Sequence, residues 1–172
     1  MIKKYDKQLK MHRSAGLALP NIAPPAGFHM RGMREGEQTC WSQICLGEFD
    51  ITEPSLDWFM KKMHDQPMSE IFFICNEADI PVGTATAQML QGEPFLHYIA
   101  VHKDWRGRGL AKPLMSHVLA RHAELGRAGC YLTTDDFRLP AINSYLQFGW
   151  QPVMWSDDAQ QRWEDIYAKL GG

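Results

Sequence analysis

The stretch from Val101 to Ala111 reads VHKDWRGRGLA, with glycines at Gly107 and Gly109. The apolar run over residues 95–101 that precedes it predicts a strand. The run that follows is amphipathic, with apolar residues at helical spacing at Leu110, Leu114, Val118 and Leu125. The order is therefore strand, glycine-rich turn and helix. Such a turn directs unpaired backbone N–H groups and the positive end of the helix dipole to one point, where a phosphate binds.

Two widespread phosphate-binding motifs do not match this stretch. A dinucleotide-binding fingerprint requires a third glycine where Lys112 stands, and a P-loop requires Gly-Lys-Ser/Thr where residues 109–111 are Gly-Leu-Ala. What remains is the pattern Arg-x-x-Gly-x-Ala over residues 106–111. Arg106 and Arg108 add two cationic side chains at the rim of the turn.

A second segment, residues 130–150, reads CYLTTDDFRLPAINSYLQFGW. Its first part, residues 130–134, predicts a short strand, after which Asp135 and Asp136 offer helix-capping side chains. Residues 141–148 predict a short helix that ends at Gly149, a position that favours a left-handed residue.

Both motifs resemble those of the GNAT superfamily of N-acyltransferases. Residues 106–111 are similar to its acetyl-CoA pyrophosphate loop, Gln/Arg-x-x-Gly-x-Gly/Ala. Residues 141–150, AINSYLQFGW, are similar to its Ala-Ile-x-x-Tyr-x-x-x-Gly-Phe segment. The resemblance covers residues 70–153 well and the N-terminal half loosely. It implies an α/β fold of the α+β type, with a mixed, mostly antiparallel central sheet flanked by helices.

The resemblance implies acetyl-CoA as the cosubstrate and the contacts that hold it. The pyrophosphate is expected on the backbone N–H groups of the loop, and the pantetheine arm along the strand at residues 97–101. The N–H near Ile99 is expected to polarise the thioester carbonyl. The residues expected to bind the cosubstrate here are Ile99, Ala100, Val101, Arg106, Gly107, Arg108, Gly109, Leu110 and Ala111.

The resemblance also implies two candidates for proton transfer. Tyr145 stands at the family's general-acid position, and a phenol with a pKa near ~10 is protonated at neutral pH. His97 stands where many relatives carry a glutamate, and an imidazole with a pKa near ~6.5 is a credible base. By the period of two in a strand, His97, Ile99 and Val101 share one face, and Tyr98 points into the core.

Each of these assignments has an alternative. Tyr145 is otherwise a core aromatic of an amphipathic helix, and His97 a structural residue of its strand. His102, at the mouth of the loop, is a rival base. Arg138 stands where the family usually has an asparagine that contacts CoA. We count Arg138 among the cofactor-binding residues because it could reach a phosphate of CoA. The alternative is that it contacts neither CoA nor a phosphate.

The C-terminal segment departs from the family's usual closing strand. Ser-Asp-Asp at residues 156–158 precedes apolar residues at i, i+3, i+4 and i+7, namely Trp163, Ile166, Tyr167 and Leu170. This pattern predicts a terminal helix. The helix covers the sheet edge or packs on a second subunit, which would make the protein a homodimer.

The composition excludes several classes of partner. With 172 residues and a formal net charge of −2, the chain gives no reason to expect nucleic acid or an anionic membrane as a partner. No apolar run approaches the length of a membrane span. The leader MIKKYDK is basic but lacks the apolar stretch of a signal peptide, so a cytoplasmic protein is expected.

The cysteines and histidines do not predict a metal site. The spacing of Cys40, Cys45, Cys75 and Cys130 contains neither Cys-x-x-Cys nor a His/Cys ligand pattern, and free buried thiols are expected. The seven histidines are scattered along the chain. We therefore expect no metal.

Prolines separate a leader from the rest of the chain. Residues 1–26 are expected to form a basic, proline-containing leader whose first part is solvated and mobile, and residues 27–172 a single domain. Within that domain the patterns predict strands at 28–34, 70–76 and 81–88 and helices at 37–44 and 55–64.

The expected function is transfer of an acetyl group from acetyl-CoA to a primary amine, by direct attack in a ternary complex. The alternative is a CoA-binding sensor or interaction module of the same fold with little turnover. The acceptor, a small molecule or a peptide, is not specified. Candidate acceptor contacts are Trp41, Trp58, Phe59, Trp150 and Trp155, with Glu48, Asp50 or Asp57 for an ammonium group.

Overall fold

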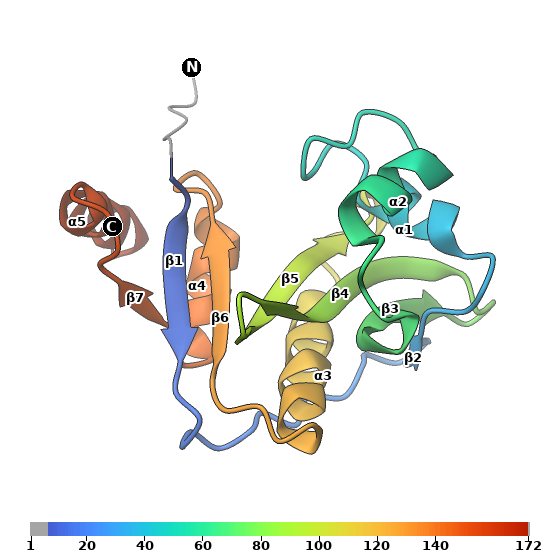
Figure 1. The fold of residues 1–172 in the computed structure, drawn as a ribbon, viewed down its shortest axis with the longest axis horizontal. Helices are drawn as coiled ribbons and strands as arrows, with labels where there is room; N and C mark the ends of the chain where they lie inside the picture. The colour runs from blue at the N-terminus through green and yellow to red at the C-terminus, as the bar shows by residue number, and fades with distance from the viewer. Residues whose placement is uncertain (1–6, 172) are drawn as a thin grey trace. The chain divides into compact units, whose positions relative to one another are not determined.

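The computed structural model describes residues 7–171, in two compact units (Figure 1). One unit comprises residues 19–127. The other, called the terminal unit, combines the described residues up to Ala18 with those from Ala128 onward. The α/β fold with antiparallel strand pairing, flanking helices and a C-terminal helix is confirmed.

The 19–127 unit is built on four strands that pair antiparallel in the order β2, β3, β4, β5. Its elements are β2 (Phe28–Gly32), α1 (Gln38–Ile44), α2 (Leu56–Met63), β3 (Ile71–Asn76), β4 (Pro81–Leu90), β5 (Glu93–Val101) and α3 (Ala111–Glu124). The sequence predicted each of them. Ser55 caps α2 by accepting a hydrogen bond from the N–H of Trp58, as a serine at that position should.

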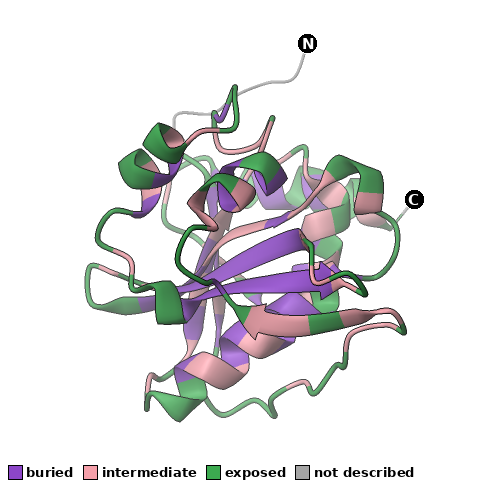
Figure 2. Ribbon diagram, turned by 90° about the vertical axis from the view of Figure 1, so that its right-hand side faces the viewer, coloured by how far each residue is buried: buried purple, intermediate pink, exposed green. Residues whose placement is uncertain are grey.

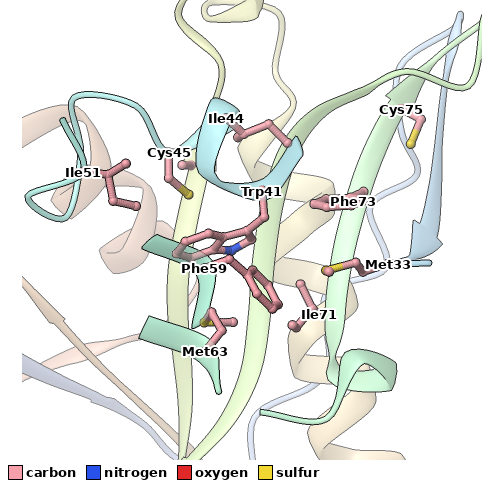
Figure 3. Packing of buried hydrophobic residues seen from close by; sticks show 11 residues of the cluster. Met33, Trp41, Ile44, Cys45, Ile51, Phe59, Met63, Ile71, Phe73 and Cys75 are labelled. Carbon is pink, nitrogen blue, oxygen red and sulfur yellow. The ribbon is translucent and has the colours of Figure 1, made fainter. Parts of the chain in front are cut away.

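The alternating directions of the side chains along β3 show which helices of this unit cover each face of the sheet. Phe73 belongs to the buried cluster that includes residues of α1 and α2 (Figure 3). Phe72 instead points to α3, where its ring lies 4.5 Å from that of His117. Because successive side chains of a strand point to opposite faces, α1 and α2 cover one face and α3 the other.

The core on the α1/α2 face is centred on Trp41. Its ring is fully buried and lies edge-on to Phe59, with centroids 5.6 Å apart. Burial of each large apolar side chain contributes roughly 1.5–3 kcal/mol to folding. Figure 2 shows buried residues mostly along the strands and on the inner sides of the helices. The buried members of the cluster are Met33, Trp41, Ile44, Cys45, Ile51, Phe59, Met63, Ile71, Phe73, Cys75 and Ala100.

A β-bulge interrupts β5 next to Tyr98. Thr84 of β4 pairs with Ala100, whereas Thr86, two residues along, pairs with His97, so β5 carries one extra residue. Tyr98 takes a φ of 47°, in the left-handed region. Directly paired residues share a face, so His97 lies on the α1/α2 face with Ala100. The expectation that His97 shares the face of Ile99 and Val101 was therefore wrong.

The terminal unit has an N-terminal strand at the centre of its sheet. β1 (Leu9–Arg13) pairs antiparallel with both β6 (Cys130–Thr134) and β7 (Gln151–Val153). Leu9, Met11 and Arg13 are buried. The expectation of a solvated, mobile arm was wrong for this segment, and the basic residues Lys3 and Lys4 lie outside the described residues.

Two helices complete the terminal unit, α4 (Leu139–Gln147) and α5 (Ala159–Leu170). Gly149, with φ of 89°, terminates α4 as predicted. The N-cap of α4 is Arg138 rather than Asp135 or Asp136, whereas that of α5 is Asp158, within the predicted Ser-Asp-Asp run; neither side chain caps its helix. Asp136 instead accepts two hydrogen bonds from the buried Arg162 of α5.

Three of the four cysteines, Cys45, Cys75 and Cys130, are buried thiols, and Cys40 is half-buried.

Leu125, expected on the buried side of α3, follows the end of that helix and is 40% exposed. Within residues 7–171, no helix combines the length and apolarity needed to cross a membrane.

Candidate functional site

The glycine-rich turn lies between β5 and α3, as predicted. Residues 103–105 form a short 3₁₀ turn, and Gly107 and Gly109 follow, each with a φ of 76°. A Cβ at either glycine would meet no described atom within 4 Å, so the backbone conformation rather than space requires glycine here. The helix α3 then begins at Ala111, with Pro113 in its first turn, where a missing N–H is tolerated.

The turn leaves backbone donors available. Among the described residues, no hydrogen-bond acceptor is found for the N–H groups of residues 107–110. They precede a helix of 14 residues, whose dipole favours negative charge at this end. The turn can therefore hold a phosphate on donors that are already in place.

The two arginines of the turn differ in their surroundings. Arg106 donates from Nε to the Val101 carbonyl and from Nη2 to Oε1 of Glu48, both at 3.0 Å. The guanidinium of Arg108 lies 4.8 Å from the ring centroid of Trp105, and the residue is exposed. Arg106 is thus engaged within the protein, while Arg108 is a cation at the surface of the turn.

His97 is half-buried between two side chains. Its ring stacks on that of Tyr98 with centroids 3.9 Å apart. Its Nδ1 lies 2.5 Å from Oε1 of Gln88 on β4. Because that oxygen can only accept, Nδ1 carries the proton and Nε2 keeps a lone pair. The sequence did not point to Gln88. The register of the β4–β5 hairpin, which pairs Thr86 with His97, places Gln88 on the same face as His97, two residues along β4.

The environment of His97 makes it a weak base. Burial lowers the pKa of its imidazole to about 4, and the nearby charge of Lys62 on α2 acts in the same direction. The ring is therefore neutral near pH 7. The rival His102 is also partly buried, and its Nδ1 accepts a long hydrogen bond of 3.4 Å from the N–H of Asp104.

Tyr145 lies on α4 in the terminal unit. Its side chain is 7% exposed, and its ring lies edge-on to Trp150 with centroids 6.0 Å apart. Burial raises the pKa of the phenol to about 12, although Arg138 acts against this. The hydroxyl is therefore a proton donor throughout the physiological range. Arg138 itself is ion-paired with Asp135, Nε to Oδ2, at 3.1 Å.

The candidate acceptor contacts separate into different classes. Trp41, Phe59 and Trp150 are buried in the core, whereas Trp155 is 41% exposed. Glu48 is paired with Arg106 and not available as an anchor for an ammonium group. A hollow of about 460 Å³ lies beside the turn, lined by Gln43, Ile44, Leu46, Gly47, Ile51, Thr52, His102 and Lys103.

A cluster of His29, Cys75 and Asp79 has ligand atoms within 4.8 Å of one another. Both carboxylate oxygens of Asp79 already accept hydrogen bonds from arginines, Arg31 at 2.8 Å and Arg34 at 2.5 Å. Burial also raises the pKa of the Cys75 thiol to about 11, which disfavours the thiolate that a metal requires. The donors do not fit a cation.

Comparison with known proteins identifies a matching family model and solved structures of similar fold. A family model described as the acetyltransferase (GNAT) family matches residues 30–150. No curated protein sequence matches the chain significantly.

Solved structures are similar at low identity. A GCN5-related N-acetyltransferase from Sphaerobacter thermophilus superposes with a TM-score of 0.70 at 19% identity, covering 87% of this chain and 50% of that one. The ribosomal-protein-S18-alanine N-acetyltransferase from Escherichia coli gives 0.59 at 19%, covering 71% and 76%. A chain of the NatC complex bound to Gag peptide and CoA gives 0.62 at 16%, covering 77% and 92%.

These likenesses concern the fold. The chain spans about half the length of the first structures it matches, 50% of the Sphaerobacter protein and 55% of a GCN5-related N-acetyltransferase from Kribbella flavida.

Proposed function

The chain belongs to the GNAT family of acetyltransferases, and from this premise we propose that it transfers an acetyl group from acetyl-CoA to a primary amine in a ternary complex. The observation that carries the proposal is the turn at residues 106–111. It combines the family's Arg-x-x-Gly-x-Ala pattern with two left-handed glycines and N–H donors that lack acceptors among the described residues. Few other ligands suit such a turn as well as a pyrophosphate.

The proposed contacts of acetyl-CoA follow the chain through β5 and the turn. The pyrophosphate takes the N–H groups from Gly107 to Ala111, with Arg108 as the neighbouring cation. The pantetheine arm lies along residues 99–101 of β5. The N–H of Ile99 polarises the thioester carbonyl, as an oxyanion-hole donor does.

Two side chains are proposed for the proton transfers. The amine nitrogen attacks the thioester carbonyl carbon, a C–N bond forms, and the C–S bond breaks to release the CoA thiolate. Tyr145 donates to the departing sulfur, consistent with a pKa of about 12 that keeps the phenol protonated. Nε2 of His97 accepts the proton lost by the amine. The lowered pKa of the imidazole keeps this lone pair available at neutral pH, but it also limits the strength of the base.

The acceptor is proposed to be an amine of a small molecule or a peptide. One similar structure is of the NatC complex bound to Gag peptide and CoA, and another is of the ribosomal-protein-S18-alanine N-acetyltransferase. This supports a peptide amine without selecting it.

The test of the proposal is calorimetric titration of acetyl-CoA into the purified protein. Saturable binding is expected, with weaker binding of adenosine diphosphate and of NAD, which carry a pyrophosphate but lack the pantetheine arm. Arg108→Gln should weaken acetyl-CoA binding about threefold, the effect of one exposed charge pair. Absence of binding at millimolar acetyl-CoA would mean that the turn is only a helix start, and the proposal would be wrong.

A CoA-binding module with little turnover is the second candidate. The observation in its favour is the environment of His97, which lowers the pKa of the imidazole to about 4 and makes it a poor base for an amine. Binding of acetyl-CoA without acetylation of any amine in a broad acceptor screen would favour this function over the first.

A further inference from the structure

The loop between α1 and α2 folds back on itself at residues 45–51, here called the 45–51 loop. The N–H of Glu48 donates to the Cys45 carbonyl at 2.9 Å. Phe49 and Asp50 have φ values of 54° and 63°, in the left-handed region that non-glycine residues rarely adopt. Such a conformation persists when contacts outside the loop hold it.

Two neighbouring side chains of the 45–51 loop make those outside contacts. Oε1 of Glu48 lies 3.0 Å from Nη2 of Arg106, the first residue of the phosphate-binding motif. The ring of Phe49 lies edge-on to Tyr98 at the bulge of β5, with centroids 5.2 Å apart and planes at 87°. The loop therefore contacts the chain on both sides of residues 99–105.

The contact between Glu48 and Arg106 helps to hold the backbone of the turn. The same guanidinium donates from Nε to the Val101 carbonyl, at the end of β5. Arg106 is thereby fixed at two nitrogens, and its backbone leads into Gly107, the first left-handed residue of the turn. The Glu48 side chain is 20% exposed and that of Arg106 51% exposed, so the pair is partly open to water and its effect on binding is expected to be modest.

We propose that Glu48 is a positioning residue for acetyl-CoA, acting through Arg106 on the backbone of residues 106–110. This rests on the proposed function, because it assumes that these N–H groups bind the pyrophosphate. Arg106 then serves to shape the turn, and the cation that faces the phosphate is Arg108. The acidic residue needed for this role lies 58 residues before Arg106 and outside both sequence motifs.

The test compares Glu48→Gln with Asp50→Asn by calorimetric titration of acetyl-CoA and of adenosine diphosphate. Asp50 is exposed and lies in the same loop, and asparagine tolerates its left-handed φ, so this variant controls for the loss of one negative charge. Relative to Asp50→Asn, Glu48→Gln should weaken both ligands about fivefold, because both carry the pyrophosphate. Thermal unfolding of both variants should match the wild type.

A double-mutant cycle tests whether Glu48 acts through Arg106. Glu48→Gln combined with Arg106→Gln should weaken acetyl-CoA binding no more than Arg106→Gln alone. Combined with Arg108→Gln, which lies outside the pair, its effect should add. Hydrogen exchange without ligand should become faster at the amides of residues 106–110 in Glu48→Gln and stay unchanged in β3. A general loss of stability would raise exchange in both regions.

The outcomes separate this inference from the function it rests on. If the wild type does not bind acetyl-CoA, the proposed function fails and the role of Glu48 with it. If the wild type binds and Glu48→Gln behaves like Asp50→Asn, only the positioning role is overturned. Tighter binding by Glu48→Gln than by Asp50→Asn would also overturn it, because the carboxylate would then compete with the phosphate for Arg106.

Discussion

At the scale of single residues, the two proton-transfer candidates have pKa values displaced in opposite directions by the same cause. Burial disfavours the charged form of any group, so it lowers the pKa of the His97 imidazole and raises that of the Tyr145 phenol. Both residues are therefore neutral at pH 7. A neutral imidazole can accept a proton and a neutral phenol can donate one, which are the states the proposed reaction needs at its start.

The titration of His97 can be measured directly. We expect its ring protons to titrate near pH 4 in nuclear magnetic resonance spectra, with the signal assigned by its loss in His97→Gln. Lys62→Gln should raise that pKa, because the lysine charge opposes protonation of the ring. A midpoint near 6.5, the ordinary value, would show that solvent reaches the imidazole freely.

Replacement of Tyr145 tests the donor to the leaving thiolate. Tyr145→Phe should lower kcat about tenfold to a hundredfold and leave the Kd of acetyl-CoA within about twofold, since the hydroxyl acts only as charge develops on sulfur. Steady-state kinetics with any accepted amine, together with calorimetry, measures both quantities. Unchanged kcat would return Tyr145 to the role of a core aromatic packed on Trp150.

At the scale of elements, the turn before α3 and the strand β4 use glycine for different reasons. Gly109 has a φ of 76° and open space around an added Cβ. Gly83 in β4 has an ordinary backbone, but a Cβ there would lie 2.8 Å from Cγ2 of Ile74 and 3.2 Å from Cδ1 of Leu114. The first glycine serves backbone conformation and the second serves close packing of α3 on the sheet.

These reasons predict different effects of the same substitution. Gly109→Ala should weaken acetyl-CoA binding about tenfold while costing only about 1 kcal/mol of stability, because the strain is relieved by a change in the turn. Gly83→Ala should cost about 1–3 kcal/mol of stability through overpacking. Urea unfolding and calorimetry on both variants measure the contrast. Equal losses of stability would contradict this assignment of the two glycines.

At the scale of the whole molecule, the buried histidines and an ion-paired carboxylate make stability depend on pH on the acid side. Burial lowers the pKa values of His97, His117 and His122 below 6.5. Hydrogen bonding to Arg31 lowers the pKa of Glu37 below 4.5. In each case the unfolded chain binds protons at a higher pH than the folded chain does. The contribution of these groups to stability is therefore greatest above pH 6.5 and falls as the pH is lowered.

Urea unfolding at several pH values measures this dependence. Between pH 7 and pH 5 His97 alone should account for a loss of about 2 kcal/mol, because its pKa falls from 6.5 to about 4 on folding. His97→Gln should remove that part of the slope and leave the part due to the other histidines. A free energy of unfolding independent of pH over this range would contradict the burial of these rings.

The fold and the conformation of the glycine-rich turn were largely predictable, because their signals are local. Leu114 and Val118 of α3 are buried as their spacing predicted, and the φ values of Gly107 and Gly109 are those that only glycine adopts readily. The strand β1 was missed, because five residues of mixed character give a weak signal until two partner strands cover them. The surroundings of His97 were missed because an inserted residue in β5 shifts the face of every side chain on one side of it.

The order strand, glycine-rich turn and helix at residues 95–124, and the family whose model matches the chain, follow from the amino-acid sequence alone. Periodicity, capping and turn chemistry act between residues close in the chain, so they can be read without coordinates. The pairing of Glu48 with Arg106, the contact of Gln88 with His97, and the lowering of the His97 pKa by burial all depend on tertiary contacts. Glu48 and Arg106 lie 58 residues apart in the chain, and the contact of Gln88 with His97 depends on the register of the β4–β5 hairpin, so hydrophobic periodicity reveals neither.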